Sequence, residues 1–353
     1  MPLFTGTLNT NAVFAAIFNM IISQQVFSDN IAGGAGLADK ARVDGSLYGD
    51  TKLYYSTDVL NSHVWGGDLE APNLLALHRP PAPSCQSITL NVFRQIDLTV
   101  DSYLTKQAWK DEGAFASFNG VMQSWMSDTK KVYDFTTYSA FLGCDAPTAN
   151  NQTRSIALST LTSTDEELDR QRASMIAEGI ANILSELCDD VNRVNDLGYL
   201  RKWEKSRIKI VWNIEYVNEI EKRDLPTIFH KDDLFEKVSE FMPARFFGAI
   251  NAAATAGDGS TVRSLIEQDI GSNHYFAGDL IAVGDTAPAG TSYTQDSTVI
   301  CKILVEYPPL MSAFEVGTSF FNPKSLTENM YLTWGHNSLE HLYNYPLITV
   351  SES

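Results

Sequence analysis

Apolar residues recur at steps of three and four positions between Ala114 and Leu142, and this spacing predicts one long helix. Gly143 follows directly, and a glycine at this place favours a left-handed helix end. At about 1.5 Å per residue the helix would be about 40 Å long, several times the usual length. Such a rod is typical of a flat domain, although the core helix of an ordinary enzyme is the alternative. The stripe consists of Phe115, Phe118, Met122, Trp125, Thr129 and Val132.

Two runs of alternating apolar and polar residues precede this helix and predict strands. The first extends from Thr51 to Leu60 and the second from Ser87 to Leu104. At about 3.3 Å per residue the second strand would extend about 60 Å, which is too long for one compact domain. The connection from Asn61 to Ser84 is rich in proline, which stops strand ladders from growing. We therefore predict that residues 49 to 108 form a two-stranded ribbon that projects from the body.

One face of the second run is apolar, and we expect it to contact another copy of the chain. A lone two-stranded ribbon is only marginally stable in water, so a long one needs a surface to lie against. Trp65, in the connection between the strands, is a further candidate for this contact. The candidate residues on the strand face are Leu90, Val92, Ile96 and Leu98.

Residues 1 to 28 contain no charged side chain, yet they include an apolar run from Ala12 to Ile22. The run is too short to cross a membrane, and no basic residues precede it as they do in a signal peptide. We predict an arm that buries Phe14, Phe18 and Ile21 on the main body or on a neighbouring subunit. A simple N-terminal core helix fits the same pattern equally well.

The chain after the long helix mixes helices and strands. Overlapping capping boxes at Ser163 and Thr164 begin a second long helix, whose apolar stripe continues to Gly198. Clean alternation from Ile208 to Tyr216 predicts a central strand. The other expected elements are a short strand at Thr153 to Ser159, a helix that begins near Asp232 between Pro226 and Pro243, a flexible connection at Ala252 to Ser260, and strands at Leu280 to Val283, Val299 to Glu306, Ser312 to Thr318, Met330 to Trp334 and Leu347 to Val350.

Charge and cysteine content exclude several classes of protein. The formal net charge is −17, from 43 acidic and 26 basic residues, so the chain repels phosphate backbones and is not expected to read DNA. The cysteines lie far apart, and no histidine stands at zinc-ligand spacing from them, so we expect neither a metal site nor a disulfide framework. Reduced thiols in a cytoplasm are the simpler account. The four cysteines are Cys85, Cys144, Cys188 and Cys301.

Few residues indicate catalysis. His336 and His341 lack the spacing of a metal-binding helix motif, so we expect structural histidines. His230 could act with Asp232 and Asp233 as an acid and base group, but Asp232 stands where a helix cap is expected. No nucleophile elbow, phosphate-binding loop or cysteine nucleophile frame is present. We therefore expect no enzyme, no cofactor and no metal.

The order of arm, ribbon, long helix, compact mixed domain and closing strands resembles the major capsid proteins of tailed bacteriophages. Their α+β fold is the Hong Kong ninety-seven type of phage coat, which herpesvirus capsids and encapsulin compartments share. Trp109 to Tyr138, Lys205 to Asp233 and Asn322 to Val350 are similar to coat proteins of podophages that infect Gram-positive bacteria. The resemblance implies an N-terminal arm at 1–48, an extended E-loop ribbon at 49–108, a peripheral domain with the spine helix at 109–151, an axial domain at 152–309 and closing strands of the peripheral domain at 310–353.

The resemblance also implies a function and partners. It implies a structural protein that self-assembles, through pentamers and hexamers, into an icosahedral shell enclosing the viral DNA genome of a virion. Scaffolding, portal and decoration proteins are the implied partners, without a membrane, and synthesis takes place in the cytoplasm of a bacterial host. Two alternatives stay open: an encapsulin-like compartment shell of the same fold, and a soluble hydrolase with an unrecognised site. The uncharged arm and long ribbon count against the hydrolase, because a monomeric enzyme would expose both.

Overall fold

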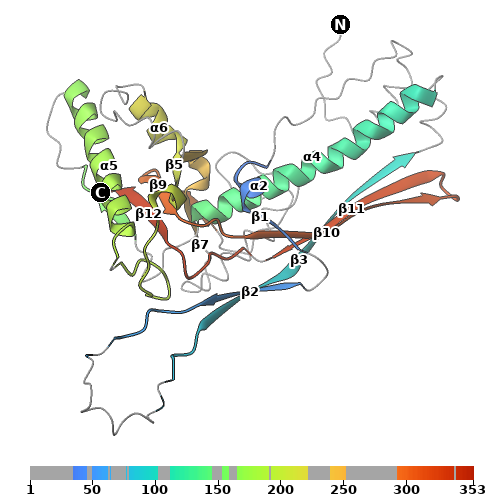
Figure 1. The fold of residues 1–353 in the computed structure, drawn as a ribbon. Coiled ribbons are helices and arrows are strands. Elements are labelled where there is room, and N and C mark those ends of the chain that lie inside the picture. The colour runs from blue at the N-terminus through green and yellow to red at the C-terminus, as the bar shows by residue number, and fades with distance from the viewer. Residues whose placement is uncertain are drawn as a thin grey trace.

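The computed structural model of the chain describes residues 35–45, 50–62, 64, 77, 79–101, 112–144, 153–158, 165–190, 192–221, 239–251, 292–337 and 339–353. Within these ranges the protein is an elongated α+β molecule, with a compact unit at one end and a long sheet at the other (Figure 1). Residues 1–34 of the predicted arm, the start of the helix near Asp232, the connection at Ala252 to Ser260 and the strand at Leu280 to Val283 lie outside the described residues. Residues 35–45, assigned to the arm, instead belong to the body of the subunit, and residues 239–242, where the predicted helix would end, form a strand.

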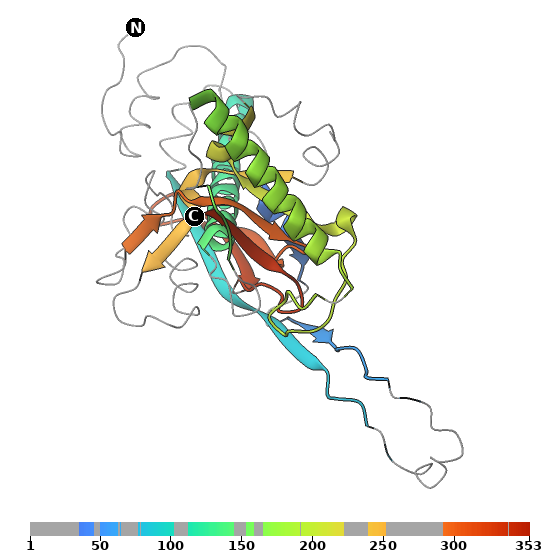
Figure 2. The ribbon, with the colours of Figure 1, turned by 90° about the vertical axis from the view of Figure 1, so that its left-hand side faces the viewer.

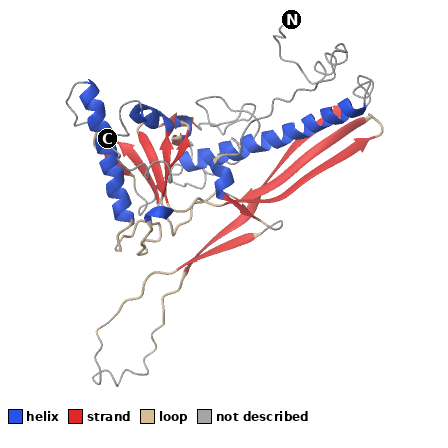
Figure 3. Cartoon of the chain, turned by 45° about the horizontal axis from the view of Figure 1, so that its top comes forward, coloured by secondary structure: helices blue, strands red, loops and turns tan. Residues whose placement is uncertain are grey.

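The long sheet contains five strands in the order β1-β10-β11-β3-β2. All neighbouring pairs are antiparallel except β1 with β10, which is parallel. A hairpin turn joins β10 to β11, and both of its strands extend away from the compact unit (Figure 3). The strands are β1 (Arg42–Asp44), β2 (Thr51–Ser56), β3 (Ser84–Asp101), β10 (Leu310–Asn322) and β11 (Thr327–Asn337).

Helix α4 (Glu112–Cys144) runs along one face of this sheet and is the long helix expected from the sequence (Figure 1). Tyr133 on α4 contacts β11 through Trp334, with ring centroids 5.4 Å apart, and through a 2.8 Å hydrogen bond between its hydroxyl and His336 Nε2. Arg94 on β3 lies over the same tyrosine ring at 5.6 Å. Because side chains alternate along a strand, the even-numbered positions of β3 and β11 face α4.

The compact unit is built on a second five-stranded sheet in the order β4-β12-β9-β5-β6. Helix α5 (Asp165–Leu187) covers this sheet and buries Ile176, Ile180 and Leu187 in a core with Ile303 and other sheet residues. The central strand β5 has both faces buried, as expected of a strand between two layers. The strands are β4 (Arg154–Ile156), β5 (Lys209–Asn213), β6 (Ser239–Met242), β9 (Val299–Leu304) and β12 (Leu347–Glu352), and a separate pair is β7 (Gly248–Asn251) with β8 (Ser292–Gln295).

A second core joins the compact unit to the end of α4. It contains Tyr138, Phe141 and Leu142 from α4, together with Phe246 and the short helix α2 (Leu37–Ala41). Gly143 lies inside α4, which continues to Cys144, and the described glycines with a positive φ are Gly36 and Gly198. The predicted left-handed end at Gly143 is therefore wrong. Glycine is needed at position 143 for close packing, because an added Cβ would lie 1.9 Å from the carbonyl oxygen of Phe246.

Two other predicted boundaries are also wrong. Helix α5 ends at Leu187 and does not continue to Gly198, because the Asn192 side-chain amide donates a hydrogen bond to the Leu187 carbonyl and satisfies the helix end. Strand β5 ends at Asn213, where α6 (Ile214–Glu221) begins. The Asn213 side chain accepts the backbone N–H of Glu215 and so caps the first turn of α6.

Strand β3 (Ser84–Asp101) is the long strand that the alternating pattern predicted from Ser87 to Leu104, but it begins earlier and is not confined to a two-stranded ribbon. It pairs with β2 only from Ser84 to Thr89, whereas its pairing with β11 extends from Leu90 to Asp101. Most of β3 therefore belongs to the long sheet of the subunit. The segment that projects is the connection between β2 and β3, of which the structure describes residues 57–62, 64, 77 and 79–83. We call it the projecting loop.

Candidate functional site: the base of the projecting loop

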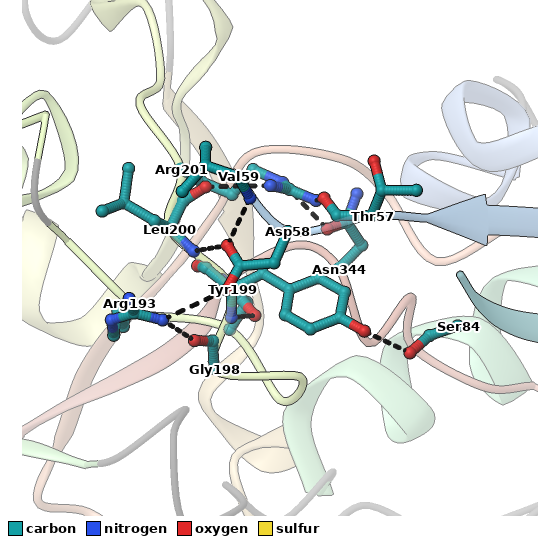
Figure 4. A network of polar contacts seen from close by, with 11 residues as sticks. Thr57, Asp58, Val59, Ser84, Arg193, Gly198, Tyr199, Leu200, Arg201 and Asn344 are labelled. Atoms are coloured by element: carbon teal, nitrogen blue, oxygen red, sulfur yellow. Dashed lines mark hydrogen bonds and ion pairs between the residues drawn. The ribbon is translucent and has the colours of Figure 1, made fainter. Parts of the chain in front are cut away.

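Both strands that carry the projecting loop are fixed to a segment of the compact unit at residues 192–201. Figure 4 shows Thr57, Asp58 and Ser84, at the ends of β2 and β3, meeting Arg193, Tyr199, Leu200 and Arg201. Figure 2 shows the chain that follows β2 and precedes β3 leading away from the compact unit beyond this point. We call this group of polar contacts the loop base.

Asp58 is the centre of the loop base. Its Oδ1 accepts hydrogen bonds from the backbone N–H groups of Val59 and Leu200, at 2.9 Å and 3.0 Å, and its Oδ2 lies 3.4 Å from Nη1 of Arg193. The Leu200 N–H bond is the main reason that the pKa of Asp58 lies below its ordinary value, with the Val59 N–H bond next. The ionised carboxylate is therefore the form that holds the loop to the compact unit.

Arg201 supplies the second attachment. Its Nη2 donates to the carbonyl oxygen of Thr57 at 2.6 Å, and its Nε donates to Oδ1 of Asn344 at 3.1 Å, so one guanidinium joins three segments. On the other strand, the Ser84 hydroxyl shares a hydrogen bond with the Tyr199 hydroxyl. The planar, forked donor geometry of arginine suits a junction of this kind.

An open groove lies beside the loop base, with a cavity volume of about 220 Å³. Every residue that lines it is uncharged, in a protein whose formal net charge is −17. Leu53 and Tyr55 of β2 are more than half exposed along this part of the sheet. The groove can accept an uncharged or aromatic group without repulsion from nearby carboxylates. Its walls are Leu53, Tyr54, Tyr55, Ser56, Ser84, Cys85, Gln86, Leu197, Leu342, Tyr343, Asn344 and Tyr345.

The described part of the projecting loop exposes aliphatic side chains to solvent. The exposed fractions are 54% for Val59, 71% for Leu60, 89% for Val64 and 82% for Leu77. Such side chains gain about 1.5 to 3 kcal/mol each when a partner fully buries them. Val59 and Leu60 were expected in the strand Thr51 to Leu60, but β2 ends at Ser56. Val64 and Leu77 lie in the proline-rich connection, which could have indicated them.

The structure places the sequence-predicted interface residues in three different settings. Phe14, Phe18, Ile21 and Trp65 lie outside the described residues. Leu90 is buried within the subunit. The remaining three are half-buried on the face of β3 that looks toward α4, and their contact with a second copy stays a prediction: Val92, Ile96 and Leu98.

The two histidines near the C-terminus have structural partners. His336 is buried, and its Nδ1 donates to the Asn337 carbonyl while Nε2 accepts the Tyr133 hydroxyl. Burial lowers the pKa of His336 to about 4. His341 shares a hydrogen bond with Asp196. No cluster of metal-ligating side chains occurs in the described ranges, and no helix there is both long and apolar enough to cross a membrane.

Comparison with known proteins identifies the fold. No protein-family model and no curated protein sequence matches the chain. The chain is similar to the capsid structure of Staphylococcus phage Andhra, with a TM-score of 0.59 and 12% identity over 94% of this chain and 87% of that chain. It is also similar to the structure of head fiber and inner core protein gp22 of native bacteriophage P68, with a TM-score of 0.60 and 11% identity over 94% of this chain and 88% of that chain. The resemblance seen in the sequence is therefore confirmed at the level of the fold, which is the α+β fold of a phage capsid structure.

Proposed function

We propose that this protein is the major capsid protein of a tailed bacteriophage and that it self-assembles into the icosahedral shell enclosing the viral DNA. The observation that carries the proposal is the projecting loop, which the loop base directs away from its own subunit while Val64 and Leu77 stay almost fully exposed. The fold shared with the Andhra capsid structure supports the same function.

A second copy of the chain is the natural partner of this loop. Exposed apolar side chains on a projecting segment are a liability in a monomer, and they become favourable only when another surface covers them. Contacts between different surfaces of identical subunits form a closed ring when the rotation between neighbouring subunits closes. Pentamers and hexamers that join into a closed shell are the outcome that we propose.

The charge of the chain fits a container for DNA. With 43 acidic against 26 basic residues, the shell would hold a genome without binding its phosphates tightly, which favours packaging and ejection. We propose a structural protein rather than an enzyme, made in the cytoplasm of a bacterial host and carried in the virion. Scaffolding, portal and decoration proteins are its proposed additional partners.

Assembly of the purified protein tests the proposal. We expect sedimentation and negative-stain microscopy, with scaffolding protein supplied, to show capsomers or closed shells. Val64→Asp combined with Leu77→Asp should leave a folded subunit but prevent assembly, because each carboxylate would have to lose its hydration at the contact. Ser62→Asp, which adds a charge at an exposed polar position of the same loop, is the matched control. Monomers alone from the wild-type chain would contradict the proposal.

A further inference from the structure

The face of the long sheet that points away from α4 is exposed. Even-numbered positions of β3 face the helix, whereas every odd-numbered residue of β3 from Phe93 to Thr99 is exposed. Residues directly opposite one another on neighbouring strands share a face, so the strand register extends this surface across β11 to β10. We call it the outer face. It consists of three cross-strand rows, Gln95–Thr333–Val316, Asp97–Tyr331–Thr318 and Thr99–Asn329–Phe320, together with the opposed pair Phe93 and Gly335.

The outer face is almost without charge. Asp97 is the single charged residue among its eleven members, although the whole chain has a net charge of −17. Asp101 lies beyond the last row, opposite Thr327. Glu328 lies opposite Val100, at an even-numbered position of β3, and therefore belongs to the α4 side. A ligand of the outer face must accordingly be held by hydrogen bonds and apolar contacts rather than by ion pairs.

Polar side chains on the outer face hold one another in place. Nε2 of Gln95 donates a hydrogen bond to Oγ1 of Thr333 at 2.8 Å, and Oγ1 of Thr99 donates to Oδ1 of Asn329 at 2.8 Å. Each pair uses one polar atom of the amide. The other atom, Oε1 of Gln95 or Nδ2 of Asn329, has no hydrogen-bond partner among the described residues. The two amides therefore offer an acceptor and a donor at positions that the sheet already fixes.

An aromatic ring lies at each end of the outer face. The Phe93 ring lies over Gly335, where an added Cβ would come within 2.8 Å of its Cε1 atom, so glycine lets the ring rest on the backbone of β11. The exposed fractions are 37% for Phe93 and 61% for Phe320. Phe320 belongs to the row of Thr99, six residues along β3 from Phe93, so the two rings are about 20 Å apart along the strands.

We propose that the outer face binds a neutral polysaccharide. A sugar ring has faces of C–H groups that pack on aromatic rings, and its hydroxyls pair with amides and with other hydroxyls. The outer face offers both kinds of contact in alternation. It is a sheet surface rather than a cleft, which suits an extended polymer, because small ligands are held in concave sites. Asp97 and the negative charge of the chain repel acidic polysaccharides, so the selectivity is for uncharged sugars.

This binding goes beyond the proposed function, because a shell can assemble without it. The test applies the purified, unassembled subunit to an array of neutral oligosaccharides of glucose, galactose, mannose and N-acetylglucosamine, and of acidic oligosaccharides that contain uronic or sialic acid. We expect binding to one or more of the neutral glycans and none to the acidic ones. Titration calorimetry with the neutral glycan that binds best then gives the affinity of each variant.

Phe320→Ala and Phe321→Ala form a matched pair. Phe321 is next to Phe320 and 49% exposed, but it lies opposite Glu328 and therefore on the other face of the sheet. We expect Phe320→Ala to weaken glycan binding about tenfold or more, and Phe321→Ala to leave it unchanged. Gln95→Ala should also weaken binding, because it removes one of the two amides. Circular dichroism of each variant checks that the subunit stays folded.

Three results would overturn the proposal. They are the absence of binding to every neutral glycan, equal binding of acidic and neutral glycans, and an equal effect of Phe320→Ala and Phe321→Ala. If Phe320→Ala instead prevents assembly and leaves glycan binding unchanged, the outer face is a contact between copies of the chain and not a polysaccharide site. Shells that form normally from a subunit without glycan binding would leave the proposed function in place.

Discussion

The carbonyl oxygen of Phe246 lies so close to the α-carbon of Gly143 that a Cβ atom there would come within 1.9 Å of it. This contact joins the end of α4 to the compact unit, because Phe246 belongs to the short 3-10 helix at Ala244–Phe246. Phe135, which precedes Gly143 in α4, adds an edge-on contact with the Phe246 ring, with the ring centroids 5.7 Å apart. The long helix is thus held to the compact unit by backbone packing that only glycine permits at position 143.

Gly143→Ala should destabilise the subunit, because either α4 or the Phe246 backbone must move to make room. We expect the free energy of unfolding to fall by about 3 kcal/mol, as for other overpacked cores. Urea unfolding followed by circular dichroism measures the change. Gly317→Ala is the matched control, because an added Cβ at Gly317 meets no atom within 4 Å, and it should change the free energy by about 0.5 kcal/mol or less.

Asp58→Asn should loosen the loop base without unfolding the subunit. The amide keeps one acceptor oxygen but loses the charge that strengthens the bonds from the Leu200 N–H and Arg193. We expect faster amide hydrogen exchange at Leu200 and faster proteolysis of the projecting loop. Asp190→Asn is the control, because Asp190 forms an exposed ion pair with Lys202 just outside the segment 192–201. Equal protection of Leu200 in the wild type and Asp58→Asn would show that the carboxylate does not hold the loop.

The wild-type loop base should respond to acid in the same direction. The pKa of Asp58 is lowered in the folded protein from its ordinary value of 3.8, so its contribution to the loop base is present above that pH. The contribution is lost as the pH falls through the lower, folded pKa. Protection of the Leu200 amide should therefore decrease below about pH 4 in the wild type and show no such step in Asp58→Asn.

His336 gives a second pH dependence, at higher pH. Burial lowers its pKa from 6.5 to about 4, so the unfolded chain takes up a proton before the folded protein does. Stability is therefore complete above about pH 6.5 and falls as the pH decreases toward 4, by up to about 3 kcal/mol. His336→Gln should lower the stability at pH 7 and flatten the loss between pH 7 and pH 4. An equal loss in both proteins would mean that other groups cause the acid dependence.

The long helix and the long strand could be predicted because their signals are local. The stripe along α4 and the alternation along β3 each depend on near neighbours in the sequence, and both elements occur where expected. The predicted ends of elements are wrong where one polar side chain ends a strand or a helix. Asn213 ends β5 and caps α6, although Ile214 and Tyr216 continue the alternating pattern of the strand.

The loop base could not be predicted, because its contacts join residues far apart in the sequence. Asp58 meets Leu200 across 142 positions, and Arg201 meets Thr57 across 144. No periodic pattern marks such a pair, and aspartate and arginine on a surface are most often solvated. The projecting loop was expected from its prolines and its length, but the contacts that set its direction appear only when the chain is folded.

Substitutions on the face of β3 that looks toward α4 distinguish a free-standing ribbon from a strand inside a sheet. A free-standing ribbon predicts that Val92→Asp with Leu98→Asp leaves the stability of the subunit unchanged and blocks only assembly. In the sheet, Leu98 lies opposite Met330 and Val92 lies opposite His336, and both of these partners on β11 are buried. A carboxylate placed on this face must lose part of its hydration inside the subunit itself.

We therefore expect Leu98→Asp to lower the free energy of unfolding by about 1 to 3 kcal/mol, measured by urea unfolding of the unassembled subunit. Thr318→Asp is the control, because Thr318 is exposed on β10 and the substitution should cost about 0.5 kcal/mol or less. Unchanged stability in Leu98→Asp would mean that α4 does not pack on this part of β3. The half-buried leucine would then serve contacts between subunits alone, and a defect in assembly without a change in stability would be its signature.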